Sequence, residues 1–347
     1  MAVASWLTDL AASPELFPLT LDAASERVRL VRLAPVDYEK ASFLDERLEA
    51  PAAGEAAFGE LAEAMAGRPI ACDVIFHLGH VGSTLLSRLL GTHPRVFSLR
   101  EPQVLRTLAA ADAAGRPWDD GQLDARLGVF LALFSRVWAP PQRALVKATS
   151  LVSGLAPRLL AQAPDARALA MATAPEPYLA AIFSGDNLGD VRRAAPIRIA
   201  HLKARLGAEP WALEDLSPGE LAALSWAADS LAFAELDAVA PGRVLRVDFE
   251  AFLADPPAGV AAALAHLHGS AEPGEVAAIA GSAYLQRYSK APEYGYGREL
   301  RAHVLAETRR LAAEEIARGL AWLDAVARAW PAIAGLMNSA ASPPSRG

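Results

Sequence analysis

The chain has 347 residues, a formal net charge of −7 at pH 7 and 53% hydrophobic residues. This apolar fraction is ample for a buried core, but no apolar run reaches the ~18–20 residues of a membrane-spanning helix, so we expect no membrane partner. The net negative charge disfavours a surface that binds nucleic acid, because such a surface needs clustered Lys and Arg to release counterions from phosphates.

The first 68 residues predict an N-terminal extension of strand and helices that packs on the core. Residues 25–33 alternate between charged and apolar side chains, as a half-buried strand does. The stretches 36–49 and 55–66 are typical of helices.

From residue 69 to residue 335, short apolar strands alternate with helices. Strands are expected at 73–78, 96–99, 144–148, 167–172 and 243–248, and helices at 83–91, 122–138, 153–162, 217–239 and 314–330. Strands separated by helices predict an α/β fold in three layers, with a mostly parallel sheet of about 4–5 strands flanked by helices. The Ser- and Pro-rich residues 336–347 are expected to form a disordered tail.

A glycine-bearing loop follows the first of these strands and has the sequence Gly79-His80-Val81-Gly82-Ser83-Thr84. The first N–H groups of the helix that follows have no partner within the helix, and the helix dipole adds partial positive charge there. Loop and helix start therefore predict a cradle for a phosphate or a similar anion. A P-loop that hydrolyses ATP or GTP carries a lysine before its Ser or Thr; here none separates Gly82 from Ser83, which disfavours that chemistry.

Polar residues follow several of the other strands. Glu101 comes after 96–99, Lys147 lies at the end of 144–148, and Thr173 follows 167–172. Ligands on parallel sheets bind beyond the carboxyl ends of the strands, so we expect these residues to converge with the loop on one site.

The loop and the segments after it resemble the sulfotransferases. The loop with Leu85-Leu86, followed by Thr92-His93-Pro94-Arg95-Val96, is similar to the family's P-K/R-S-G-T/S-T-x-L loop and its later H-P-x-V. Matches in the same order continue with Glu101-Pro102, Leu145-Val146-Lys147 and the segment 245–256, so that the resemblance covers roughly residues 70–260. It implies the P-loop-type sulfotransferase fold, with 3′-phosphoadenosine 5′-phosphosulfate (PAPS) as co-substrate and its phosphosulfate end held by the loop.

The resemblance and the strand ends suggest roles for single residues. Glu101 is the candidate base for the proton of an acceptor hydroxyl, or else it caps a helix that begins at Pro102. His80 stands at the family's Lys/Arg position, where a cation steadies the leaving phosphate. Lys147 is a lone charge in an apolar strand, which supplies positive charge to the site or pairs with a core acid. The predicted donor-binding residues are Gly79, His80, Val81, Gly82, Ser83, Thr84, Leu85, Thr173, Lys290 and Arg298.

The chain departs from the family at the site for the 3′-phosphate of the donor. The family uses an arginine and a serine in a motif like R-D-P-x-D-x-x-x-S, and here Thr173 and Ala181 stand in their places. Either another cation replaces the arginine or the donor is not PAPS. Two basic segments could supply that cation: 192–205, which could form a lid, and 287–298, where tyrosines could stack a purine beside the cations.

These features leave three functional interpretations open. The first is an enzyme that transfers a sulfuryl group from PAPS to a hydroxyl or amine of a small acceptor, whose identity the sequence does not reveal. The second is a kinase-like phosphotransferase that holds Mg²⁺ with Asp248 and Glu250, and the third is a catalytically weak nucleotide- or anion-binding module.

The histidines and the cysteine outside these motifs indicate no further site. His266 and His268 resemble a ligand pair, but no cysteine or acid stands beside them at zinc-site spacing, so we expect no metal. The single cysteine, Cys72, cannot form an internal disulfide, and no basic stretch precedes the first apolar residues, so we expect a cytoplasmic protein.

Overall fold

The computed structural model describes residues 5–207, 211–287 and 297–341. Its centre is a five-stranded sheet in the order β5-β6-β4-β7-β8, in which every neighbouring pair is parallel. The strands are β4 (Cys72–His77), β5 (Val96–Arg100), β6 (Arg143–Lys147), β7 (Ala168–Ala172) and β8 (Val244–Asp248). The fold is therefore α/β with a parallel sheet, as the alternation of strands and helices predicted, and each strand lies within a few residues of its expected place.

The strand order places β4 at the switch point of the sheet. The chain goes from β4 outward to β5 and back to β6 on one side, and then continues to β7 and β8 on the other side. The loops that leave the carboxyl ends of β4, β6 and β7 consequently diverge around one crevice, which is where ligands bind in sheets of this type.

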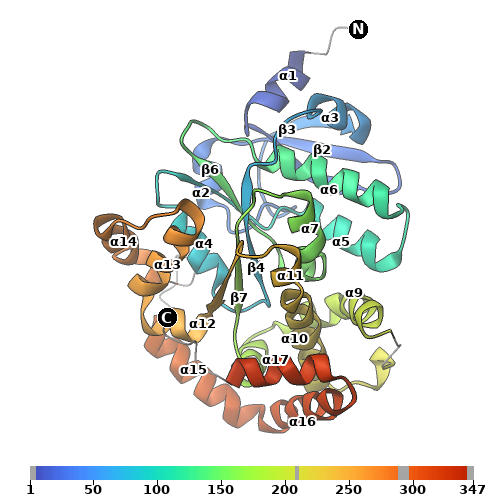
Figure 1. Ribbon diagram of the computed structural model, residues 1–347, viewed down its shortest axis with the longest axis vertical. Helices are drawn as coiled ribbons and strands as arrows, with labels where there is room; N and C mark the ends of the chain where they lie inside the picture. Colours follow the sequence, from blue (N-terminus) through green and yellow to red (C-terminus); the bar gives the residue numbers. More distant parts are fainter. Residues whose placement is uncertain (1–4, 208–210, 288–296, 342–347) are drawn as a thin grey trace.

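Helices cover both faces of the sheet, as Figure 1 shows. One layer holds α4 (Ser83–Leu90), α12 (Phe249–Ala254), α13 (Pro256–His268) and α14 (Pro273–Ala280). The other holds α5 (Val104–Ala114), α6 (Asp120–Phe134), η1 (Ser150–Leu155), α7 (Ala156–Gln162), α9 (Leu188–Leu206), α10 (Pro218–Ala234) and α11 (Leu236–Val239). The predicted helix 217–239 is thus divided in two near Glu235, and its capping box is present: Ser217 accepts from the Glu220 N–H at 3.3 Å, and Glu220 accepts from the Ser217 N–H at 2.8 Å.

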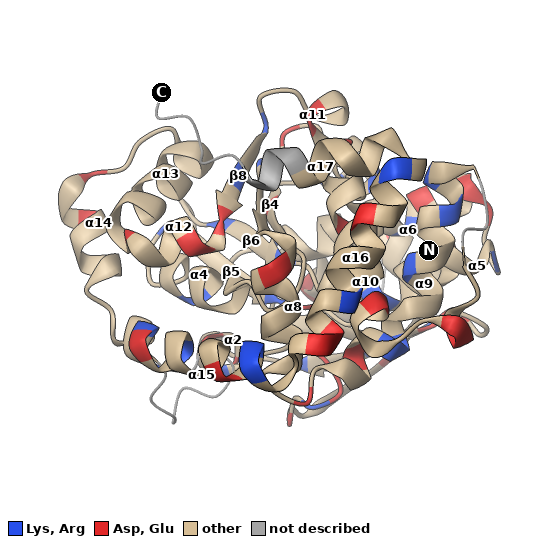
Figure 2. Ribbon diagram, turned by 90° about the horizontal axis from the view of Figure 1, so that it is seen from below, with Lys and Arg blue, Asp and Glu red and all other residues tan. Residues whose placement is uncertain are grey.

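The C-terminal helices close the end of the molecule beside the carboxyl ends of the strands. α15 (Arg298–Leu311) runs along α8 (Pro175–Phe183), and α16 (Ala313–Ala329) packs on α10 (Figure 2). α17 (Pro331–Ala341) follows directly. Residues 336–341, the first part of the predicted disordered tail, belong to this helix, in which Ile333 is fully buried; residues 342–347 lie outside the described residues.

The N-terminal residues form a separate small sheet against the core. β1 (Leu16–Asp22), β2 (Arg27–Arg32) and β3 (Ala52–Ala57) are antiparallel, and α1 (Ser5–Ala12), α2 (Pro35–Lys40) and α3 (Phe58–Ala64) flank them. The prediction of a helix over 36–49 is wrong beyond Lys40. The backbone there has tertiary partners instead: Leu44 N donates to Arg100 O at 2.7 Å, and Gln103 N donates to Leu44 O at 3.1 Å. The first residues of the predicted helix 55–66 likewise pair as β3.

Among the described residues, no helix combines the length and the apolar character that a bilayer crossing needs.

Candidate functional site

The loop after β4 adopts a backbone that ordinary residues rarely take. Gly79, His80 and Gly82 all have positive φ values, of 88°, 55° and 66°. Gly79 also donates its N–H to His77 Nδ1 at 3.0 Å, which ties the loop to the end of the strand. A non-glycine residue in the left-handed region is uncommon, so the conformation of His80 is held by the rest of the loop. The loop thus turns sharply and α4 begins at Ser83.

Gly82 is required by packing as well as by conformation. A Cβ built at Gly82 would lie 2.0 Å from Cε2 of Phe249, the first residue of α12. The Phe249 ring is covered on another side by the Arg301 guanidinium, 4.7 Å from the ring centroid, and Arg301 pairs with Glu250 at 2.7 Å. The residue before α4 is therefore packed against Phe249 of α12, whose ring Arg301 of α15 covers.

A cavity of about 1400 Å³ opens above the carboxyl ends of the strands. Most predicted site residues line it, and they are Gly79, His80, Gly82, Ser83, Thr84, Leu85, Glu101, Lys147 and Arg298. Val81 is 1% exposed and does not line it. Thr173 does not line it either: the residue is 5% exposed, and its carbonyl accepts from Trp226 Nε1 at 3.0 Å. Lys290 and the tyrosines of the same segment lie outside the described residues.

Glu101 lies at the floor of this cavity in a constrained setting. Its φ is 52°, its N–H donates to Lys147 O at 2.7 Å, and its side chain is 8% exposed. Glu101 Oε1 accepts from Lys147 Nζ, and Oε2 accepts from Arg106 Nη2 at 2.9 Å. Burial alone would raise the pKa of Glu101, but Lys147, His77 and Arg106 lower it by more, so the carboxyl titrates below its ordinary range. Glu101 is an ionised carboxylate held by cations. It caps no helix, because α5 begins at Val104.

Lys147 pairs with a core acid, which is one of the two alternatives that the sequence left open. Its side chain is 1% exposed, it pairs with Glu101, and it also lines the cavity. A buried ammonium is stable only with a partner and hydrogen bonds, and Glu101 supplies them. The pair therefore places a positive group at the wall of the cavity that the loop also lines, and Glu101 balances its charge.

Two further residues of this cluster were missed by the sequence analysis. His77 ends β4, with Nε2 4.0 Å from Glu101 Oε1, and Arg106 reaches Glu101 from α5. His77 could have been found by the same strand-end rule that selected Lys147. Arg106 gave no signal, because only the folding of α5 onto the sheet edge brings it to the carboxylate.

The basic segment 192–205 forms most of α9. Arg193 and Arg198 line the cavity, but Arg198 is 4% exposed and its Nη2 donates to Asp229 Oδ2 at 2.8 Å. Arg205 pairs with Glu235 at 3.0 Å. Arg198 and Arg205 therefore tie α9 to neighbouring helices, whereas Arg193 pairs with Asp190 within α9.

The carboxylates proposed for Mg²⁺ have other partners in the structure. Asp248 accepts from the Ala251 N–H at 2.8 Å as the N-cap of α12, and Glu250 pairs with Arg301. Within the described part of the chain, no group of three or more His, Cys, Asp or Glu side chains is arranged to hold a metal ion.

The fold of this chain is similar to those of several solved sulfotransferase structures. The sulfotransferase domain from the curacin biosynthetic pathway is 13% identical with a TM-score of 0.42, over 71% of this chain and 98% of that chain. A sulfotransferase from Alicyclobacillus acidocaldarius is 17% identical with a TM-score of 0.37, over 76% of this chain and 96% of that chain. A sulfotransferase from Mycobacterium avium is 15% identical with a TM-score of 0.37, over 73% of this chain and 79% of that chain.

No protein-family model and no curated protein matches the chain.

Proposed function

We propose that this chain is a group-transfer enzyme that moves a sulfuryl group from PAPS to a hydroxyl or amine of a small acceptor. The observation that carries the proposal is the loop 79–84, which turns through three left-handed residues into the start of α4 and faces a cavity of about 1400 Å³. A helix start of this kind binds an anion through backbone N–H groups. The resemblance of the loop to that of sulfotransferases selects phosphosulfate among the possible anions.

Arg287 and Arg298 are our candidates for the 3′-phosphate of the donor, in place of the arginine that Thr173 replaces. Both line the cavity, and neither has a carboxylate partner among the described residues. The two flanks of the segment meet, because a Cβ on Gly297 would lie 3.3 Å from Gln286 Oε1. Two guanidinium groups from adjoining positions suit a doubly charged phosphate, which they can bind through charge-assisted hydrogen bonds.

The transfer step would rest on positioning and on charge stabilisation. The acceptor oxygen forms a bond to sulfur while the bond from sulfur to the phosphate oxygen breaks, and adenosine 3′,5′-bisphosphate leaves. The α4 start, His80 and Lys147 would stabilise the charge that develops on the leaving phosphate. Glu101 would accept a hydrogen bond from the acceptor hydroxyl and take its proton.

The proposal is tested by ligand-induced stabilisation of the purified chain. Adenosine 3′,5′-bisphosphate at 100 times its Kd should raise the free energy of unfolding by about 2.7 kcal/mol, whereas 5′-AMP and Mg-ATP at the same concentration should have smaller effects. Arg298→Gln should weaken binding of the bisphosphate about tenfold or more, and Gly82→Ala should abolish it through loop strain and collision with Phe249.

Arg310→Gln is the matched control, because it removes the same charge from the same helix at an exposed side chain that does not line the cavity. Stabilisation by Mg-ATP alone would replace the proposal with phosphoryl transfer. Binding of the bisphosphate without turnover of labelled PAPS on any acceptor of a broad panel would leave a binding module.

A further inference from the structure

We propose that the acceptor carries an anionic oxygen group, a carboxylate or a phosphate, which Arg47 and Arg106 bind beside the transfer site. This inference rests on the proposed function and names the substrate class of the same cavity. It comes from a second, smaller cavity of about 480 Å³ between the 41–48 segment and α5. Arg47, Arg106 and Leu151 line both cavities, so they form the wall between them.

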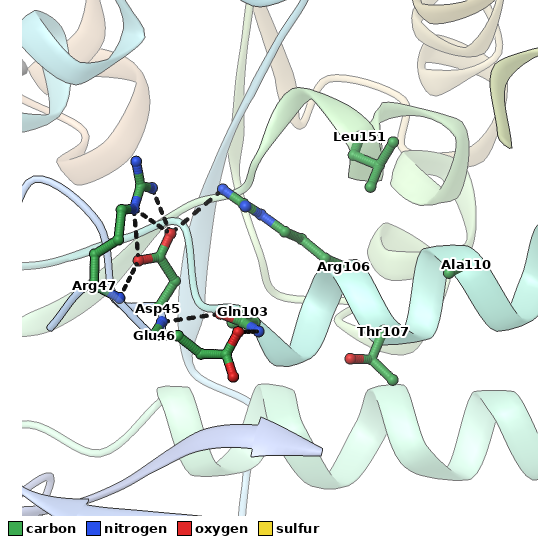
Figure 3. Close-up of a pocket in the computed structure, with 8 residues that line it drawn as sticks. All are labelled: Asp45, Glu46, Arg47, Gln103, Arg106, Thr107, Ala110 and Leu151. Atoms are coloured by element: carbon green, nitrogen blue, oxygen red, sulfur yellow. Dashed lines mark hydrogen bonds and ion pairs between the residues drawn. The ribbon is translucent and has the colours of Figure 1, made fainter. Parts of the chain in front are cut away.

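The two guanidinium groups converge on one carboxylate, Asp45 (Figure 3). Arg47 donates from Nε to both oxygens of Asp45, at 2.9 and 3.1 Å, and Arg106 Nη2 lies 3.7 Å from Asp45 Oδ2. The Arg47 guanidinium also lies 3.8 Å from the centroid of the Phe43 ring, which fixes its plane. Two planar, pre-oriented cations thus lie next to each other at the wall of the cavity.

In the cluster of Asp45, Glu101, Arg47 and Arg106, the negative side chains are buried and the positive ones are more exposed. The Asp45 and Glu101 side chains are 5% and 8% exposed, whereas those of Arg106 and Arg47 are 34% and 60% exposed. In an ordinary surface ion pair both partners face water. Here the carboxylates are buried and the guanidinium groups are the exposed partners, so a ligand that reaches this cluster meets positive charge.

A donor group remains available on that face. Nη1 of Arg47 donates to no acceptor among the residues that the structure describes, and beneath it the buried Nε of Arg106 has no hydrogen-bond partner there either. A guanidinium presents five N–H donors, and planar anions such as carboxylates use them in pairs. Glu46, the second acid of the small cavity beside Asp45, is exposed and accepts from Gln103 Nε2 at 3.1 Å, which leaves the Arg47–Arg106 face uncovered.

The arrangement of these charges also sets the direction in which an acceptor would lie in the cavity. Arg106 contacts Glu101, which contacts Lys147 at the floor of the large cavity, so the cations and carboxylates form one chain from the transfer site to Arg47. An acceptor whose hydroxyl meets Glu101 would place a substituent a short distance away at Arg106 and Arg47. An anionic substituent fits there, and a cationic one would be repelled.

Binding by calorimetry tests this without requiring turnover. The probes are 4-hydroxyphenylacetate, (4-hydroxybenzyl)phosphonate and the neutral 4-hydroxyphenylacetamide, each added to the full chain with and without adenosine 3′,5′-bisphosphate. We expect at least one anionic probe to bind tenfold or more tightly than the amide. Arg47→Gln should reduce that preference to about twofold or less, while Arg32→Gln, which removes an arginine of similar exposure outside both cavities, should keep it.

Equal binding of the anionic probes and the amide, or no binding of the anionic probes, would overturn the inference. The same titrations report on the proposed function separately. Failure of the bisphosphate to bind, with the anion preference intact, would reject the donor but keep the subsite. Binding of the bisphosphate without anion preference would reject the subsite alone.

Discussion

At the scale of residues, the pair of Glu101 and Lys147 illustrates how a site can be charged and still be part of a core. Both side chains are buried, and each compensates the other. Removing one partner leaves an isolated buried charge. Replacing both by neutral groups removes that unpaired charge, together with the proposed role of the pair in transfer.

We therefore predict opposite outcomes for single and double substitutions. Glu101→Gln should lower the free energy of unfolding by about 3–5 kcal/mol, because Lys147 loses its carboxylate, and Glu101→Gln combined with Lys147→Met should regain most of that loss. Urea denaturation of the four proteins of this double-mutant cycle measures the coupling. Additive losses would show that the pair is not coupled.

The same pair predicts how stability depends on pH. The pKa of Glu101 is lower in the folded chain than its ordinary value of 4.5, so the carboxylate contributes stability above that value and loses it as the pH falls. Wild type should lose more unfolding free energy than the double variant does as the pH falls from about 5 to about 3, below the ordinary pKa of the carboxyl. If Glu101 is the base, its low pKa also means that turnover shows no acid limb from this group at neutral pH.

At the scale of elements, the close approach of α10 and α16 depends on two glycines. A Cβ at Gly219 would lie 1.9 Å from Glu315 O, and one at Gly319 would lie 2.6 Å from Gly219 O. The Gly219 N–H also donates to Glu315 Oε2 at 2.7 Å, at the first turn of α10. The helix pair can approach this closely only where neither backbone carries a side chain.

We expect Gly319→Ala to destabilise the chain by about 1–3 kcal/mol, because the two backbones must separate. Gly335→Ala in α17 is the matched control, since a Cβ there meets nothing within 4 Å and should stabilise the helix by about 0.5–1 kcal/mol. Thermal unfolding of both variants measures the contrast. Equal effects at the two positions would mean that α16 can shift without cost.

At the scale of the whole molecule, buried arginines of the core hold the N-terminal layer through its backbone carbonyls. Arg136 donates from Nη1 to Ser13 O at 2.7 Å, and Arg100 donates from Nε to Ala41 O at 2.7 Å. Burial lowers the pKa of Arg100 to about 9 and that of Arg136 to about 10, which reflects how far both guanidinium groups are removed from water.

This linkage predicts that residues 5–57 unfold together with the core. Arg136→Met should cost about 1–3 kcal/mol for each carbonyl left without a donor. Hydrogen exchange should show protection falling in α1 and in the core strands at once. Arg318→Met, which removes an exposed ion pair on α16, should change stability by less than about 1 kcal/mol. Loss of protection confined to α1 in the Arg136 variant would instead define an independent N-terminal unit.

The fold and the tight turn from β4 into α4 could be predicted because both depend on neighbours along the chain. Apolar runs of strand length separated by helices indicate a parallel sheet, and Gly79 and Gly82 before Ser83 indicate a tight turn into a helix. These patterns are local, so the sequence by itself determined them.

The contacts around the loop 79–84 were decided only by tertiary structure. The path of the chain after Lys40 follows from hydrogen bonds to Arg100 and Gln103, and the ionised state of Glu101 follows from Lys147 and Arg106. Arg47 meets Arg106 only because that path lays residues 41–48 against α5. Most of these contacts join residues tens of positions apart, and the spacing of a sequence carries no record of which distant groups will meet.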